Sequence, residues 1–221
     1  MISDKYYCDF ILSIGPHCRP AVNLRLNQLR EFSSPLDWMM DYSLDTVLHL
    51  FRSGFRDFFT EYELDSAEPD GAAGMLRVND TLNGIVSIHH FPADIPPDSV
   101  YPQFAAKMHK RAQRLEFMLQ NASSVVLLSD RTESEHELSA FLYSFSEIYP
   151  HLRIRLINTR HDENMTFDSY RQETVFAYGK LSYIEYHFND TEHGAERVSG
   201  NKLIWEKILS AYHIAQAVCA D

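Results

Sequence analysis

Short apolar runs alternate with stretches of helical periodicity along most of this 221-residue chain. Residues 7–14 predict a buried strand, and helical spacing from about Pro20 to Leu29 predicts the helix that follows. The remaining expected strands cover residues 85–91, 124–129, 153–158, 175–178 and 183–187. The remaining expected helices cover residues 43–59, 101–121, 133–149 and 201–218. Residues 65–84 are expected to form a loop that can contain a short strand. Such alternation favours an α/β fold, and we expect a three-layer sandwich with a mainly parallel sheet in a single domain over residues 1–221.

Composition and charge exclude several classes of protein. Hydrophobic residues make up 45% of the chain, as in globular domains, and no apolar run approaches the ~18 residues of a transmembrane helix. The formal net charge of −11 argues against nonspecific binding to nucleic acids or anionic membranes. The N-terminus lacks a secretory signal pattern, so we expect a cytoplasmic location. Cys8, Cys18 and Cys219 have neither disulfide-framework nor metal-ligand spacing, and we expect no metal and no cofactor.

Cys18 lies at the predicted turn from the first strand into the first helix. Helix N-terminal N–H groups favour a thiolate and can stabilise an oxyanion, and this end of a strand is where α/β sheets bind ligands. Gly15, His17 and Arg19 surround the thiol and are candidate substrate-binding residues. The alternative is that Cys18 is a small buried hydrophobic residue, which is how we interpret Cys8 and Cys219.

A family resemblance begins in the same block, residues 12–40, LSIGPHCRPAVNLRLNQLREFSSPLDWMM. This block resembles the opening of a bacterial family named as putative papain-like cysteine peptidases. The resemblance rests on the spacing of Gly15, Cys18 and Ala21, on the Leu29-Arg30 pair and on PLDW at residues 35–38. The resemblance continues at IHHF, residues 88–91, and at KRAQRLEFML, residues 110–119. It implies a thiol nucleophile at Cys18. A Gln before the Cys and an aromatic after it, both typical of papain, are replaced by Leu12 and Arg19.

A thiol nucleophile needs an imidazole base and a group that orients it. The first candidates are His89 and His90 at the end of a predicted strand, with Asp37 or Asp94 as orienter; the family resemblance favours His89, and His90 is then a substrate-binding candidate. The second is Asp190-x-x-His193 before the last helix. That block resembles the end of SGNH-type hydrolases, which also place the nucleophile after the first strand, and it implies an SGNH-hydrolase-like fold. We lean towards His193 with Asp190.

Two further clusters carry candidates for substrate binding. Trp38 follows Asp37 in a predicted loop, where both can contact substrate. The alternative is that Trp38 and Met39 fill the core while Asp37 caps the helix that begins near Ser43. The segment KMHKRAQR carries four basic residues in about two helical turns, which can hold a phosphate or carboxylate or form a solvated helix face. Its Arg111 lies nearer the apolar stripe and can point into the fold.

Together these residues predict a cysteine-dependent hydrolase or acyltransferase. We expect a small-molecule substrate that carries an acyl or glycan group, no nucleic-acid or membrane partner, and an oligomeric state that the sequence leaves open. The alternatives are a non-catalytic module that binds a carbohydrate or an anion, and a papain-like cysteine peptidase.

Overall fold

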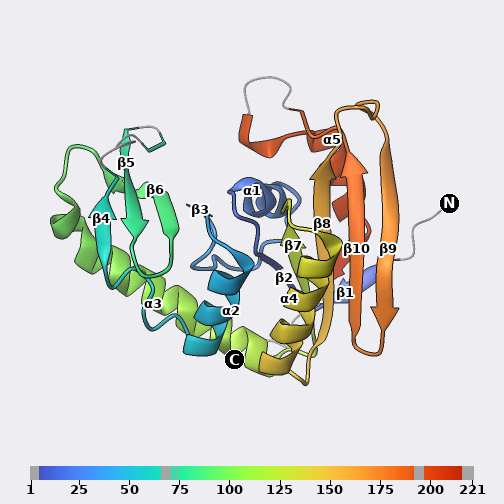
Figure 1. The fold of residues 1–221 in the computed structure, drawn as a ribbon, viewed down its shortest axis with the longest axis horizontal. Coiled ribbons are helices and arrows are strands. Elements are labelled where there is room, and N and C mark those ends of the chain that lie inside the picture. The colour runs from blue at the N-terminus through green and yellow to red at the C-terminus, as the bar shows by residue number, and fades with distance from the viewer. Residues whose placement is uncertain (1–4, 66–70, 73, 192–196, 216–221) are drawn as a thin grey trace. The chain divides into compact units, whose positions relative to one another are not determined.

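The computed structural model describes residues 5–65, 71–72, 74–191 and 197–215. The chain forms two compact units (Figure 1), each described by itself. The first unit is discontinuous and comprises residues 1–32 and 121–221, whereas the second comprises residues 33–120. The expectation of a single domain over the whole chain stays a prediction.

The first unit is built on a five-stranded sheet. Its strands, in spatial order, are β2 (Phe10–Ser13), β7 (Ser124–Ser129), β8 (Arg153–His161), β10 (Leu181–Phe188) and β9 (Tyr170–Tyr178). All neighbours pair in parallel except β9, which forms an antiparallel hairpin with β10 at one edge (Figure 1). A separate parallel pair joins β1 (Tyr6–Cys8) to β11 (Tyr212–Ile214).

Helices cover both faces of this sheet. Helices α1 (Arg19–Leu26) and α5 (Lys202–Leu209) share a buried apolar cluster with β7, β8 and β10, in which Trp205 is fully buried. Helix α4 (Glu135–Ile148) packs against β8 and β10. Strand side chains alternate between the two faces, so Ile184 contacts the first layer and Glu185 faces the opposite side. The predicted α/β fold with layers and a mainly parallel sheet is confirmed here, and the SGNH-like version of it stays a prediction.

The second unit contains an antiparallel sheet and two helices. In spatial order its strands are β3 (Met39–Met40), β6 (Ile85–Pro92), β5 (Met75–Asp80) and β4 (Tyr62–Leu64). The helices are α2 (Leu44–Ser53) and α3 (Pro97–Asn121). Aromatic rings dominate its core: Phe104 of α3 packs edge-on against Phe59 and also contacts Phe91 of β6.

Several predicted boundaries are wrong for identifiable physical reasons. Helix α2 ends at Ser53 rather than residue 59, because Gly54 adopts the left-handed conformation that terminates helices. Helix α3 begins earlier than expected, at Pro97, because proline is tolerated at the first helical position. The expected closing helix over 201–218 ends at Leu209, and its described continuation is strand β11. Residues 216–218 of that expectation lie outside the described residues. No helix in the described part of the chain is both long enough and apolar enough to cross a membrane.

Candidate functional site

Cys18 lies at the turn between β2 and α1, as the sequence predicts. It is the N-cap residue of α1, its carbonyl accepts the Val22 N–H at 2.9 Å, and its side chain is 6% exposed. Pro20 occupies the first turn, where its missing N–H leaves no helical bond unmade. The position gives Cys18 the electrostatic setting of a helix N-terminus at the carboxyl edge of a parallel sheet.

The turn before Cys18 packs tightly against the end of the neighbouring strand. A Cβ atom on Gly15 would lie 2.7 Å from Pro20 Cγ and closer still to Asp130 Oδ1, so this close approach requires glycine. Asp130 directly follows β7, and its Oδ2 lies 3.5 Å from His17 Nδ1. Its Oδ1 is buried and has no hydrogen-bond partner among the described residues. Asp130 is not among the residues predicted from the sequence, although it directly follows the predicted strand over 124–129.

Asp190 fixes Arg19, the residue after Cys18. Its Oδ2 accepts a hydrogen bond from Arg19 Nη1 at 3.0 Å, and its Oδ1 accepts from the Asn201 backbone N–H at 2.7 Å and from Trp205 Nε1 at 3.1 Å. Burial raises the pKa of Asp190, and these donors and the Arg19 charge oppose that rise. Arg19 Nε also donates to the Val198 carbonyl at 3.3 Å. Asp190 is therefore linked to the Cys18 turn through Arg19.

The expected partner of Asp190, His193, lies outside the described residues. The chain on both sides of residues 192–196 is hydrogen-bonded to α1: Asp190, before them, accepts from Arg19 at 3.0 Å, and the Ser199 carbonyl, after them, accepts from Asn23 Nδ2 at 3.0 Å. Both oxygens of Asp190 already accept hydrogen bonds. The Asp190–His193 pair stays a prediction.

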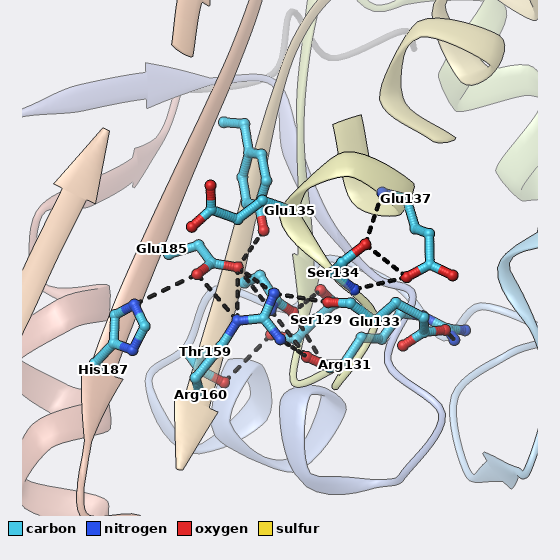
Figure 2. Close-up of polar contacts among 12 residues, drawn as sticks. Ser129, Arg131, Glu133, Ser134, Glu135, Glu137, Thr159, Arg160, Glu185 and His187 are labelled. Atoms are coloured by element: carbon cyan, nitrogen blue, oxygen red, sulfur yellow. Dashed lines mark hydrogen bonds and ion pairs between the residues drawn. The ribbon is translucent and has the colours of Figure 1, made fainter. Parts of the chain in front are cut away.

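A buried polar network lies at the carboxyl ends of β7, β8 and β10. Figure 2 shows Arg160, Glu185 and His187 converging there. Arg160 Nε donates to both oxygens of Glu185, at 2.8 and 3.0 Å, and His187 Nε2 lies 3.4 Å from Glu185 Oε2. Tyr183 donates its hydroxyl proton to the same carboxylate. Burial opposes ionisation of Glu185, but the hydrogen bonds from Arg160 and Tyr183 outweigh it and hold the pKa of Glu185 below its ordinary value.

Arg131 connects this network to the Cys18 turn. Its side chain is 1% exposed, and its Nε donates to the Ile14 carbonyl at 3.0 Å, one residue before Gly15. Asn158 holds the Arg131 backbone from β8: its Oδ1 accepts the Arg131 N–H and its Nδ2 donates to the Arg131 carbonyl, both at 2.9 Å. The network is therefore a support for the turn. Polar residues at inward positions of predicted strands, such as Glu185 in YIEYHF, were the sequence signal for it.

The second unit holds the other sequence-predicted site residues. Trp38 has a positive φ of 72°, which is rare outside glycine, and its ring meets the His89 ring edge-on at a centroid distance of 5.7 Å. The PLDW and IHHF segments therefore meet. Asp37 is buried and its Oδ2 accepts the Ser34 N–H at 3.0 Å. The alternative in which Asp37 caps α2 is wrong, because Ser43 is the cap.

The two adjacent histidines of β6 have different surroundings. His89 is half-buried, and burial lowers its pKa. His90 Nδ1 lies 2.9 Å from Ser87 Oγ, and its ring packs edge-on against Phe104. Burial, with the charges of Lys107 and Arg111, lowers the pKa of His90 to about 3. Both imidazoles are therefore neutral at pH 7.

The remaining predicted residues fall into two groups. Arg111 is half-buried on α3 and lines a basic cleft of the second unit. Cys8 is buried, as expected, and burial together with Asp9 raises its pKa to about 12. Cys219 lies outside the described residues. Within the described part of the chain, no three His, Cys, Asp or Glu side chains gather as metal ligands would.

Comparison with known proteins places these features in a family. The sequence model of the family described as "putative papain-like cysteine peptidase" matches residues 9–164, which include Cys18, Asp37 and His89 and exclude Asp190. An uncharacterized protein of Acanthamoeba polyphaga mimivirus is 22% identical over 134 residues, which are 54% of this chain and 60% of that protein. No solved structure matches. The family description supports a cysteine hydrolase at a coarse level.

Proposed function

Because this chain belongs to the family described as "putative papain-like cysteine peptidase", we propose that it is a cysteine-dependent hydrolase or acyltransferase with Cys18 as nucleophile. The observation that carries the proposal is the position of Cys18, the N-cap residue of α1 at the carboxyl edge of a parallel sheet. The unpaired N–H groups of a helix N-terminus favour a thiolate over a thiol. The guanidinium of the next residue, Arg19, is fixed by its ion pair with Asp190 and holds the start of α1 in place.

The proposed reaction uses two acyl-transfer steps. The Cys18 thiolate adds to the carbonyl carbon of an ester, thioester or amide, and the carbonyl electron pair moves to oxygen. Backbone N–H groups of the Gly15–Arg19 turn are the proposed donors to this oxyanion. The intermediate collapses to an acyl-thioester on Cys18 as the leaving group takes a proton from an imidazolium. Water, or another acceptor, then releases the acyl group.

Three imidazoles are candidates for the base. His89 is in the family-matched segment and contacts Trp38, and its lowered pKa keeps it neutral, as a base must be. His17 precedes the nucleophile and has Asp130 as its carboxylate partner. His193 with Asp190 is the third candidate; it lies outside the family match.

Amide hydrolysis is the version that the family description favours, with Cys18 as a peptidase nucleophile. The competing proposal is a non-catalytic module in which Cys18 is an inert wall of the site. The low exposure of Cys18, 6%, favours that module. The two proposals differ in whether the folded protein reacts through Cys18.

The test is the pH dependence of iodoacetamide alkylation at each cysteine, measured by mass spectrometry on the folded protein. We expect Cys18 to react with an apparent pKa well below the ordinary value of about 8.5. Cys8 is an internal reference, because its raised pKa and burial predict reaction only after unfolding. Acetylation of Cys18 by p-nitrophenyl acetate, absent from Cys18→Ser, would show the acyl-enzyme.

Variants identify the base. His17→Gln, His89→Gln and His193→Gln are compared with His136→Gln, a matched change at an exposed position of α4. We expect one of the first three to return the apparent pKa of Cys18 towards that of a free thiol, while His136→Gln leaves it unchanged. If Cys18 reacts only when the protein unfolds in urea, the enzyme proposal is wrong and the non-catalytic module stands.

A further inference from the structure

An open cleft of about 540 Å³ lies in the second unit, along one face of α3. Four basic residues line it: Lys107, Lys110, Arg111 and Arg114. Their spacing of i, i+3, i+4 and i+7 places all four on the same side of the helix. The other lining residues that the structure describes are Ser33, Gln103 and Ala106, so none of the described lining residues carries a carboxylate.

The concentration of positive charge is unusual for this protein. The chain has a net charge of −11, yet four of its 20 Lys and Arg residues line one cleft. Among the described residues, Lys107, Lys110 and Arg114 form no ion pair with any carboxylate. Burial and the nearby Arg111 charge lower the pKa of Lys107, so the cations repel one another in the unliganded protein. Like charges at this spacing destabilise a helix, and a bound anion would relieve that cost.

The geometry selects the size of the anion. Residues 107–114 span seven helical steps, about 10 Å along the axis at ~1.5 Å per residue. A diphosphate with an organic substituent places charged oxygens along more of that length than a single phosphate does, and so can contact more of these cations at once. The cleft volume lies within the range of about 300–1,000 Å³ that is typical of small-molecule sites.

We propose that this cleft binds the diphosphate group of a small organic diphosphate ester. Arg114 provides a planar guanidinium group that can donate two hydrogen bonds to one phosphate, Lys107 and Lys110 act as point charges, and Arg111 adds its charge to the cleft lining. Gln103 lines the same cleft and can hydrogen-bond to polar groups of the organic part. The inference goes beyond the proposed thiol chemistry and requires neither Cys18 nor any of the three candidate bases.

The first experiment is calorimetric titration of the full-length protein with inorganic pyrophosphate, uridine diphosphate and orthophosphate, at low salt and without divalent cations. We expect both diphosphates to bind and orthophosphate to bind at least about tenfold more weakly, since it loses about one charge-assisted contact. Affinity should fall as sodium chloride is added, because salt screens exposed charges. Tighter binding of uridine diphosphate than of pyrophosphate would show that the organic part of the ligand also contacts the cleft.

Matched variants separate the cleft from bulk charge. Lys110→Ala should weaken diphosphate binding about tenfold, and the triple variant Lys107→Ala/Lys110→Ala/Arg114→Ala should abolish it. The control, Arg52→Ala/Arg171→Ala/Lys202→Ala, removes the same three charges from exposed positions elsewhere and should bind like wild type. Alanine is a strong helix former, so circular dichroism should show α3 intact in the cleft variant.

Two results would overturn the proposal: no binding of either diphosphate, or equal losses in the cleft variant and the control. Cys18→Ser separates this proposal from the thiol chemistry. Diphosphate binding must persist in Cys18→Ser, whatever that substitution does to alkylation. Loss of diphosphate binding in Cys18→Ser would contradict an independent site in the second unit.

Discussion

Replacing Gly200 by alanine tests the link between Asp190 and the Cys18 turn. Gly200 has a positive φ of 62°, and an added Cβ would lie 2.8 Å from Asp190 Cγ and 3.0 Å from Oδ2, with Oδ1 closer still. Gly179, in the turn between β9 and β10 of the same unit, is the matched control. It has a φ of 58°, but nothing lies within 4 Å of its Cβ position. Both substitutions carry the free-energy cost of placing alanine in left-handed backbone. Only Gly200→Ala also brings a Cβ atom into close contact with Asp190.

The difference in free energy of unfolding follows from that contact. Left-handed backbone costs an L-residue about 1–2 kcal/mol at either glycine. At Gly200, Asp190 must also move by roughly 0.7 Å or more to reach a normal carbon–carbon distance of about 3.5 Å. That movement disturbs its hydrogen bonds to Trp205 and to Asn201. Overpacking of this kind costs about 1–3 kcal/mol, so Gly200→Ala should lose about 2 kcal/mol more than Gly179→Ala.

Urea denaturation followed by circular dichroism measures both losses. In the Asp190→Ala background, Gly200→Ala should cost only the backbone part, because the obstructing carboxylate is gone. Alkylation of Cys18 in Gly200→Ala provides a second readout, since displaced Asp190 releases Arg19. Equal losses for the two glycines, or an unchanged cost of Gly200→Ala without the carboxylate, would refute the packing argument.

Two further predictions concern pH. The pKa of His90, lowered by burial to about 3, means that the unfolded chain binds a proton at this residue below about pH 6.5 and the folded protein does not. Stability should therefore fall as pH drops from about 6.5 towards 3, and thermal melts of His90→Gln should show a smaller fall. Glu185 has a pKa held below its ordinary value, so its stabilising contribution is present above the unfolded pKa of about 4.3 and lost as pH falls through the lower folded value. Glu185→Gln should be less stable than wild type at pH 7 and should lose less stability below pH 4; an unchanged acid profile would contradict the argument.

Local sequence patterns predicted the elements whose contacts lie nearby in the sequence and the strands whose residues are all buried. The apolar run over 124–129 coincides with β7, because a fully buried parallel strand reads as a short apolar run between polar residues. Strand β9 was underestimated, since residues 170–174 are exposed and polar at the sheet edge. Residues 212–214, predicted as helix, form strand β11 instead, because they pair with residues 6–8, a contact that no local window contains.

The candidate site, like the fold, has one part that local sequence patterns predict and another that depends on tertiary contacts. The position of Cys18 follows from a local strand-to-helix pattern, and the structure places it at that turn. Asp130 and Arg131 reach the turn only because β7 lies beside β2, and Glu185 joins the network only because β10 lies beside β8. Strand order is set by tertiary packing, and periodicity carries no information about it.

The strand pairings also determine when the Cys18 turn can form. Phe10 of β2 pairs with Val125, and Tyr6 of β1 pairs with Tyr212. Neither strand can therefore pair until a segment more than 100 residues further along the chain has been synthesised. Such nonlocal contacts close long loops and slow folding. The continuous second unit, residues 33–120, can form its sheet while the chain is still being made. During synthesis, therefore, the Cys18 thiol is expected to stay accessible to oxidants and chaperones at least until β7, the partner of β2, has emerged.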